Sequence, residues 1–363
     1  MKVCQRDDSV VSSTGEGTRL SLPPGPGLER KRLSLVGACV NEGQDWYTGV
    51  ETAPDAFRKA GLIKVISELG FAPTDTGNIA TDFSVSFEAP SGTEYYDPDL
   101  IKKGALVGNA CGRLYERIKT ECSQNPNNFI LTLGGDHSIA AGTISAIKEV
   151  KKDIAVVWVD AHADCNTPDT SHSGNFHGMP VGLLLNWFKK KAHPAFDWAD
   201  EYLEDPLPEN RLAYIGLRDV DEGEKKLLRN SDILAFSMTD VDRLGIAEVI
   251  DRIIAKLSPD GCRPIHLSFD IDGIDPTFAP GTGTRAKGGL NYREARYICT
   301  RLAETGSLQS MDLVEVNPTI NTTEATDSAK AEHGDNPNVD SKASSTVKLG
   351  IDLIEFALGK TLI

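Results

Sequence analysis

The chain has 363 residues, of which 40% are hydrophobic and 25% are charged, and this composition is typical of a soluble globular protein. The formal net charge is −15 and no basic stripe stands out, so we expect no nucleic-acid partner. No apolar run reaches the length of a membrane span, so we expect no membrane partner either.

Cysteine usage and the first residues bear on the cellular compartment. The seven cysteines are scattered, odd in number and without C-x-x-C spacing, which favours reduced thiols over a disulfide framework. Residues 1–30 contain no apolar stretch of the kind found in signal peptides. We therefore expect a cytoplasmic protein.

The N-terminal part of the chain changes character at about residue 33. Residues 1–32 are rich in Ser, Gly and Pro, so we expect a flexible arm. A strand is predicted at 33–39, and apolar periodicity at 55–69 predicts a helix that stops at Gly70. We expect residues 72–98 to form a long loop.

Short apolar runs then alternate with helix-like stretches. The strands are predicted at 129–133, 154–159, 212–215, 233–236, 265–269 and 312–316. The helices between them are predicted at about 138–151, 178–191, 240–257 and 291–304. Apolar strands without polar interruption indicate burial on both faces, and their alternation with helices indicates a doubly wound, mainly parallel sheet. The predicted fold class is therefore α/β.

Residues 321–346 interrupt this alternation. They contain no aromatic residue and many Asn, Ser, Thr, Asp and Ala, so we expect a mobile surface insertion. A last helix is predicted at about 346–358. We accordingly expect residues 33–363 to form a single domain that carries this insertion.

Polar side chains follow the strand predicted at 154–159. Asp160, His162 and Asp164 are spaced two apart, with small alanines between them. Residues two apart in extended backbone point the same way. The three side chains would therefore project into one space, provided that the backbone stays roughly extended.

Two further predicted strands end in similar residues. Asp270 and Asp272 follow one of them, and His137 follows another. Ligands of open parallel sheets lie outside the carboxyl ends of the strands, so all three segments would meet at one edge. A single Asp at a strand end usually caps a turn or helix. Several together favour a metal site, because the carboxylates would repel one another without cations.

The residue types of this set indicate which metal it would bind. The set contains two histidines, four aspartates and no thiol, and Mn²⁺ fits such a mixture best. Bridging carboxylates could hold two ions roughly 3.5–4 Å apart, as in dinuclear hydrolases. Such a pair of ions activates water at neutral pH.

Three motifs resemble the ureohydrolases, and among them the arginase family most. These motifs are GGDHS at 134–138, DAHADCN at 160–166 and SFDIDGIDP at 268–276. The resemblance extends from about 34 to 320 and again through the last helix. It implies a three-layer α/β/α fold, two Mn²⁺ ions per subunit, and hydrolysis of a guanidinium group to release urea.

The resemblance assigns the metal ligands by position. It implies that one ion is bound by His137, Asp160, Asp164 and Asp270. It implies that the other is bound by Asp160, His162, Asp270 and Asp272. Asp160 and Asp270 would then bridge the two ions.

The resemblance also implies a substrate site. Asn166 and Ser173 match positions that bind an α-carboxylate, and Ser171 falls where a hydroxyl residue is also expected. Asp221 matches a position that faces an α-amino group. Hydroxyls and amides suit a carboxylate, and an acid suits an ammonium group. The remaining matches are Asn175 and Glu224, which are neighbouring contacts, and Thr284, which lies beside the metal-bound hydroxide.

The residues expected to take part in catalysis are Glu315, His177 and Asp164. A charge in the apolar strand around Glu315 needs a partner, and the resemblance implies the substrate guanidinium. A structural salt bridge is the alternative. His177 matches a proton shuttle, since imidazole titrates near neutrality. The other histidines are expected to be structural.

Together the matches predict a member of the arginase family that hydrolyses L-arginine to L-ornithine and urea through a hydroxide bridging two Mn²⁺ ions. One alternative is agmatinase or guanidinobutyrase, although the loop at 166–173 and Asp221 argue against it. A metal-dependent scaffold without catalysis is the other alternative. The resemblance implies a homotrimer, with Arg293 and Glu294 in an intersubunit ion-pair region.

Overall fold

A computed structural model describes residues 31–45, 47–320 and 344–361. Within them eight strands form one sheet, in which every pairing is parallel and the order is β2-β1-β3-β8-β7-β4-β5-β6. The strands are β1 (Lys31–Cys39), β2 (Phe71–Ala80), β3 (Phe129–Gly134), β4 (Ala155–Val159), β5 (Leu212–Leu217), β6 (Leu234–Ser237), β7 (Ile265–Asp270) and β8 (Leu308–Val314). The predicted parallel sheet is confirmed.

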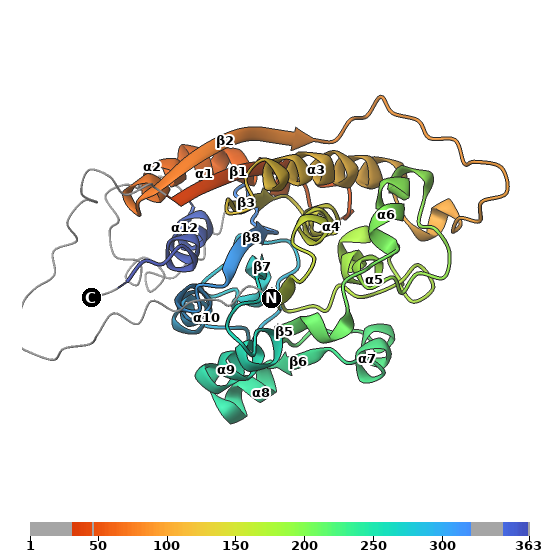
Figure 1. Ribbon diagram of the computed structural model, residues 1–363. Helices are drawn as coiled ribbons and strands as arrows, with labels where there is room; N and C mark the ends of the chain where they lie inside the picture. The colour runs from red at the N-terminus through yellow and green to blue at the C-terminus, as the bar shows by residue number, and fades with distance from the viewer. Residues whose placement is uncertain (1–30, 46, 321–343, 362–363) are drawn as a thin grey trace, which may run out of the picture.

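Helices cover both faces of this sheet, so the molecule has three layers (Figure 1). One face carries α1 (Ala53–Lys59), α2 (Leu62–Glu68), α8 (Met238–Leu244), α9 (Ile246–Leu257), α10 (Tyr292–Glu304) and α12 (Ser345–Ala357). The other carries α3 (Gly104–Gln124), α4 (Ala140–Val150), α5 (Pro180–Leu184), α6 (Asp200–Leu203) and α7 (Glu222–Arg229). The predicted three-layer α/β/α class is confirmed.

The strands supply side chains to both hydrophobic cores. In β1, Leu33 and Leu35 enter the core under α1 and α12, while Val36 enters the core under α3 and α4. Successive side chains of a strand point to opposite faces, so a strand covered on both faces has to be apolar at nearly every position. This requirement explains why uninterrupted apolar runs predicted most of the strands.

Two elements differ from the prediction because their patterns are weakly apolar. β2 begins one residue before the expected loop at 72–98 and covers its first part, as an edge strand whose residues are mostly exposed or half-buried. Helix α3 has no counterpart among the predicted elements. It contains Gly108 and Gly112, which are poor helix formers but allow close approach of the segment at 195–198.

Several predicted helices have different bounds. The helix expected at 55–69 is divided into α1 and α2 at Gly61, whose φ is 102°. The helix expected at 240–257 is divided into α8 and α9 at Gly245, whose φ is 77°. The helix expected at 178–191 is much shorter, since α5 covers only five residues. Glycines at positive φ end helices, and apolar periodicity does not register them.

The two expected flexible segments lie almost wholly outside the described residues. Of the predicted arm at 1–32, only residues 31 and 32 are described, and they belong to β1 rather than to an arm. Of the predicted insertion at 321–346, only residues 344–346 are described, and they begin α12. The division into an arm and one catalytic domain stays a prediction.

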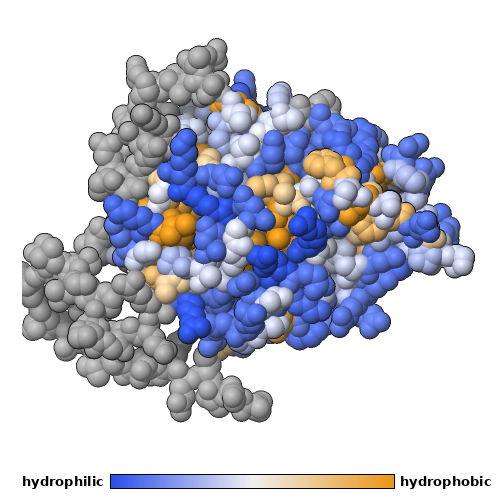
Figure 2. Space-filling model, turned by 90° about the horizontal axis from the view of Figure 1, so that it is seen from above, coloured by the Kyte–Doolittle hydropathy of each residue, from blue (hydrophilic) through white to orange (hydrophobic). Residues whose placement is uncertain are grey.

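The surface seen from above the β2 edge is mostly hydrophilic, with apolar residues in small separate patches (Figure 2). The most exposed large apolar side chains of the described residues include Phe83, at 73%, and Tyr47, at 52%. Among the helices that the structure describes, none is both long enough and apolar enough to cross a bilayer.

Candidate active site

Four neighbouring strands end in the residues that the sequence singled out. In the sheet β3, β8, β7 and β4 lie side by side. His137 follows β3, Glu315 follows β8, Asp270 ends β7 and Asp160 follows β4. Parallel strands have their carboxyl ends at one edge, so these side chains meet at that edge of the sheet.

Turns, rather than extended backbone, bring the aspartates of each segment together. β4 ends at Val159, and Asp160 Oδ1 accepts a hydrogen bond from the backbone N–H of His162 at 2.7 Å. Asp164 has a φ of 49°, in the left-handed region. The backbone is therefore not extended through residue 164, which was the condition set for convergence, yet the three side chains still converge.

The segment after β7 turns in the same way. A single 3₁₀ turn covers Ile271–Gly273, and Asp270 Oδ1 accepts from the backbone N–H of Asp272 at 2.8 Å. A short side chain that accepts from the backbone two residues later is a common turn device. Here the same carboxylates also face the histidines.

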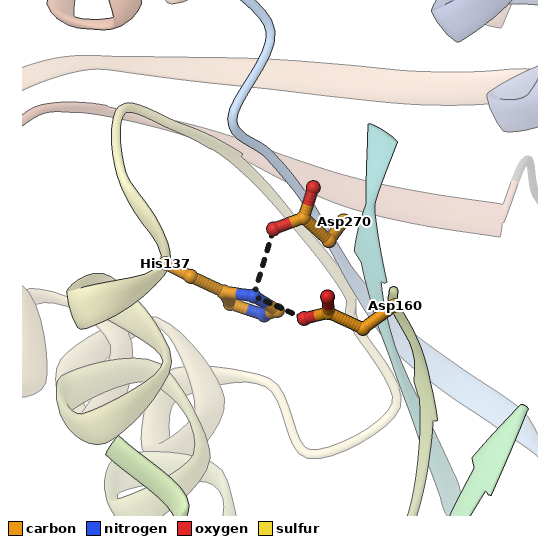
Figure 3. A group of neighbouring side chains, drawn as sticks. All are labelled: His137, Asp160 and Asp270. Atoms are coloured by element: carbon orange, nitrogen blue, oxygen red, sulfur yellow. Dashed lines mark ion pairs between the residues drawn. The ribbon is translucent and has the colours of Figure 1, made fainter. Parts of the chain in front are cut away.

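His137 is the centre of one group of potential metal ligands. Its Nδ1 lies 3.1 Å from Asp160 Oδ2, 3.1 Å from Asp164 Oδ2 and 3.2 Å from Asp270 Oδ2. Figure 3 shows the carboxylates of Asp160 and Asp270 directed at the ring of His137. Ligand atoms of His137, Asp160 and Asp270 all lie within 4.8 Å of one another.

His162 is the centre of a second group, which shares Asp160 with the first. His162 Nδ1 lies 3.3 Å from Asp160 Oδ1 and 3.1 Å from Asp272 Oδ2. The two oxygens of Asp160 thus face different histidines, as a bridging carboxylate would. Among the described residues, Asp270 belongs to the His137 group alone, so its predicted bridging role remains a prediction.

Neighbouring side chains fix the orientation of the His137 group. His137 Nε2 lies 2.9 Å from Ser268 Oγ, and the ring stacks on Trp158 with centroids 4.0 Å apart. Trp158 Nε1 donates to Asp160 Oδ2 at 2.9 Å. The contacts with Ser268 and Trp158 fix the orientation of the His137 ring, so that its Nδ1 faces the place where a metal ion would bind.

The charges of this cluster fit divalent cations. Burial, together with the charges of Asp272 and Asp160, raises the pKa of Asp270 well above its usual value. Burial and Asp160 raise the pKa of Asp164 to about 6. His137 Nδ1 is buried without a hydrogen bond although three carboxylates surround it. Bound cations would stabilise the charged carboxylates and give the Nδ1 of His137 a partner. The oxygen and imidazole donors of the cluster match those of transition-metal sites.

A cavity of about 210 Å³ opens over the metal-ligand cluster. Nine of the predicted site residues line it, namely His162, Asp164, Asn166, His177, Asp221, Glu224, Asp270, Thr284 and Glu315. The cavity also reaches Asp219, which the sequence did not single out and which lies 3.8 Å from His162 Nε2. The sequence signal for Asp219 was its position two residues after the end of β5.

Three of the predicted substrate-binding residues, Ser171, Ser173 and Asn175, do not line the cavity. Ser171 Oγ accepts from the backbone N–H of Gly174 at 3.0 Å, and Ser173 Oγ accepts from that of Asn175 at 3.2 Å. The side chain of Asn175 is buried. Both hydroxyls thus make local turn hydrogen bonds of the kind that Ser residues favour.

The other predicted substrate residues do meet at the cavity. Asn166 Nδ2 donates to Asp221 Oδ2 at 2.8 Å, and Thr284 Oγ1 donates to Asp272 Oδ2 at 2.7 Å. Asp221 also caps α7, where it exchanges hydrogen bonds with Glu224. Burial and the charge of Asp164 raise the pKa of Glu224 to about 8.

Glu315 and His177 form a hydrogen-bonded pair in the cavity. Glu315 Oε1 lies 3.1 Å from His177 Nδ1 and accepts from the backbone N–H of His137 at 2.9 Å. Burial opposes protonation of His177, but the hydrogen bond and charge of Glu315, together with the charges of Asp164 and Asp136, outweigh it and raise the His177 pKa to about 9. The pair can therefore hold a proton beside the metal-ligand cluster.

Two residues that the sequence did not single out hold the backbone segments that surround the site. Asp136 is buried and accepts from the backbone N–H of Gly43 at 2.7 Å, which joins the β1 loop to the segment of His137. Arg218 donates to the backbone oxygens of Gly273 and Ala286 at 3.1 and 2.8 Å. Asp136 is next to a predicted ligand in the chain, and Arg218 directly follows β5. The sequence did not reveal their roles because their hydrogen-bond partners are distant in the chain.

Comparisons with known proteins agree on one family. A family model described as the Arginase family matches residues 31–334. The human protein named Arginase-2, mitochondrial, is 42% identical over 331 residues, which cover 91% of this chain and 85% of that protein.

Solved structures give the same result. The native structure of the arginase from Bacillus caldovelox superposes with a TM-score of 0.76 at 33% identity, covering 92% of this chain and 100% of the other. The structure of the Entamoeba histolytica arginase in complex with L-ornithine superposes with a TM-score of 0.72 at 28% identity, covering 92% and 99%.

Proposed function

The chain belongs to the arginase family of ureohydrolases, and from this premise we propose that it hydrolyses L-arginine to L-ornithine and urea with two Mn²⁺ ions. One observation carries the proposal. Two carboxylate–imidazole groups share Asp160 at the base of a cavity that also contains Glu315, His177, Asn166 and Asp221.

The metal-binding part of the proposal concerns six residues. One ion would be held by His137, Asp160, Asp164 and Asp270, and the other by Asp160, His162, Asp270 and Asp272. A set of imidazoles and carboxylates without thiols favours Mn²⁺ over softer metals. When bound, two such ions supply Lewis acidity and activate water near neutral pH.

Glu315 would bind the guanidinium group of the substrate. Its Oε1 already accepts hydrogen bonds from His137 and His177, and among the described residues no hydrogen bond reaches Oε2. A carboxylate oxygen that faces the cavity is a strong acceptor for a guanidinium N–H. Glu315 would thereby place the guanidinium carbon beside the metal-ligand cluster.

His177 would hold the proton that ornithine needs as it leaves. Its ring contacts Glu315, and its raised pKa of about 9 keeps it protonated at neutral pH in the protein without ions. A positioned imidazolium can donate to a departing amine, and general acids of this kind contribute about 10²–10⁴-fold to the rate. Asp164 contacts His137 and also lines the cavity, so it would bind a metal ion close to the place where this proton is transferred.

The amino-acid end of arginine would be held by the residues across the cavity. Asn166 would donate to the α-carboxylate, while Asp221 and Glu224 would face the α-amino group. The structure of the Entamoeba relative was solved in complex with L-ornithine, which supports an amino-acid ligand for this chain as well. Ser171, Ser173 and Asn175 would contribute after a change in their local hydrogen bonds, and Thr284 would adjoin the activated water.

The test is turnover of two substrates after reconstitution with Mn²⁺. Agmatine is arginine without its carboxylate, so it lacks the partner proposed for Asn166. We expect arginine to be preferred, with two Mn²⁺ ions per chain by elemental analysis. A preference for agmatine would contradict the proposed substrate, and full activity without a divalent ion would contradict the proposed metal site.

We also propose that the protein is a homotrimer in the cytoplasm. The trimer rests on family resemblance, and Glu294 has a local partner as well, since it caps α10 with Asn291. The six cysteines of the described residues are all thiols, as in a reducing compartment, although the human relative is named mitochondrial. Light scattering of the purified protein and cell fractionation test these two statements.

A further inference from the structure

The side-chain amide of Asn166 is engaged at both ends. Its Nδ2 donates to Asp221 Oδ2 at 2.8 Å, and its Oδ1 accepts from Thr170 Oγ1 at 2.7 Å. A carboxylate only accepts hydrogen bonds, so the amide nitrogen has to face Asp221. The amide oxygen must then face Thr170, and the orientation of the amide is fixed by chemistry.

The hydroxyl of Thr170 has one hydrogen, and its surroundings direct that hydrogen to Asn166. Thr170 Oγ1 accepts a hydrogen bond from the backbone N–H of Thr167 at 2.9 Å, so its own hydrogen is not needed for that contact. Its contacts to the carbonyl and hydroxyl oxygens of Thr167 are longer, at 3.3 and 3.4 Å. The 2.7 Å contact to Asn166 has the usual length of an O–H···O bond.

This arrangement decides what Asn166 presents to the cavity that it lines. The oxygen is turned to Thr170 and one N–H is used by Asp221, so the second N–H is left for a ligand. A donor at this place suits a carboxylate. A substrate without the carboxylate would leave that N–H without an acceptor, and a buried group left unpaired weakens binding.

We infer that Thr170 is a specificity-determining positioning residue, which holds Asn166 so that the cavity favours guanidino substrates with a carboxylate over their decarboxylated amines. This inference rests on the proposed function. Thr170 does not itself line the cavity, so it acts through Asn166.

Packing holds Thr170 in place on the side of α7. A Cβ added at Gly223 would lie 3.1 Å from Thr170 Cβ and 3.2 Å from Asn166 Oδ1. The first turn of α7 therefore rests directly on Thr170 and Asn166 because residue 223 has no side chain. The same Cβ would lie 3.1 Å from Asp221 Oδ1, so a side chain at residue 223 would crowd all three of these residues.

Hydrogen bonds hold the same turn on its outer side. Asp169 Oδ2 accepts from the hydroxyl of Tyr96 at 3.0 Å and lies 3.0 Å from Lys189 Nζ. Tyr96 is buried, so this contact ties the turn to the interior of the molecule. The position of Thr170 is thus set from two sides, independently of any ligand.

The experiment compares Thr170→Val, which keeps the branched shape and removes the hydroxyl, with Thr170→Ser, which restores a hydroxyl. Thr167→Val is the matched control, because its hydroxyl belongs to the same turn but does not contact Asn166. All are studied as full chains reconstituted with Mn²⁺. The readouts are kcat and KM for arginine and agmatine, and binding of L-ornithine and putrescine by calorimetry.

For Thr170→Val we expect the KM for arginine and the Kd for L-ornithine to rise roughly fivefold to tenfold, the effect of one neutral hydrogen bond. The kcat for arginine, the constants for agmatine and the affinity for putrescine should stay within about twofold. Thr170→Ser and Thr167→Val should resemble the wild type.

Two results would overturn the role of Thr170. One is an unchanged preference for arginine in Thr170→Val, and the other is an equal loss for both substrates, which indicates a merely structural turn. In either case the wild type would still prefer arginine, so the proposed function would stand. A wild type without that preference would overturn the proposed substrate and this inference together.

Discussion

The Nδ1 atom of His177 lies 3.1 Å from Oε1 of Glu315, although the two residues are 138 positions apart in the chain. Glu315 has a φ of 58°, in the left-handed region that non-glycine residues seldom adopt. Asp164, with a φ of 49°, is in the same region and lines the same cavity. Backbone conformations of this kind cluster at functional sites, where the surrounding structure holds them.

The first prediction concerns the charge of Glu315. Glu315→Gln keeps the volume and removes the charge, so it should lower kcat/KM for arginine by about a hundredfold or more, since a charge-assisted hydrogen bond to the guanidinium is lost. Its Mn²⁺ content should change little. Glu149→Gln on α4 is the control, because Glu149 is also a largely buried carboxylate but lies outside the cavity. Equal activity of the two variants would contradict the role of Glu315.

The second prediction concerns pH in protein stripped of divalent ions. Burial lowers the His177 pKa, but Glu315, together with the charges of Asp164 and Asp136, raises it from 6.5 to about 9. Protonated His177 therefore contributes stability that is complete below about pH 6.5. That contribution is lost as pH rises through about 9. The melting temperature of His177→Gln should therefore fall furthest below that of the wild type at pH 6, and the difference should shrink toward pH 10.

His193 provides a control of opposite sign for this measurement. Burial lowers the pKa of His193, so its neutral form is favoured in the folded state and its contribution declines as pH falls through 6.5. The melting temperature of His193→Gln should approach or exceed that of the wild type at low pH. If the His177→Gln difference had the same pH dependence as this control, the Glu315–His177 pair would not be stabilising.

The third prediction concerns the second group of ligands. Asp272→Asn should reduce bound Mn²⁺ from two ions toward one per chain and lower urea release by more than about a hundredfold, since even outer partners of metal ligands are worth about 10–100-fold. Asp251→Asn makes the same change of charge at an exposed pair with Arg301 on the surface. Normal metal content and turnover in Asp272→Asn would remove Asp272 from the site.

The fourth prediction concerns the packing of α12 on the sheet. A Cβ at Gly350 would lie 2.7 Å from Phe57 Cζ and 2.9 Å from Leu313 Cδ2. Gly350→Ala should therefore lower the free energy of unfolding by about 1–3 kcal/mol through overpacking, as measured by urea denaturation.

Gly104→Ala is the matched control for this change. A Cβ there would meet only ordinary contacts, at 3.4 Å from Ile101 and 3.5 Å from His193. Its stability should stay within about 0.5 kcal/mol of the wild type or rise slightly. A comparable loss in both variants would show that the crowding around Gly350 is not the cause.

The sequence by itself determined the parallel α/β class and the places where the strands end. Buried strands such as β4 and β7 are apolar at successive positions, and a run of that kind is visible without any knowledge of its neighbours. Asp160 and Asp270 directly follow such runs. They were therefore predicted to lie at the edge of the sheet where the strands end. The edge strand β2, which is mostly exposed, lacked this signal.

Only the tertiary structure decided which of these residues meet, and how. The order β3-β8-β7-β4 sets His137, Glu315, Asp270 and Asp160 side by side, and strand order depends on pairings between distant segments. Individual hydrogen bonds form the turns after β4 and β7. Individual hydrogen bonds also join Ser171 to Gly174 and Thr170 to Asn166. Apolar periodicity records only whether a residue is buried, whereas a site depends on the direction in which each polar group points.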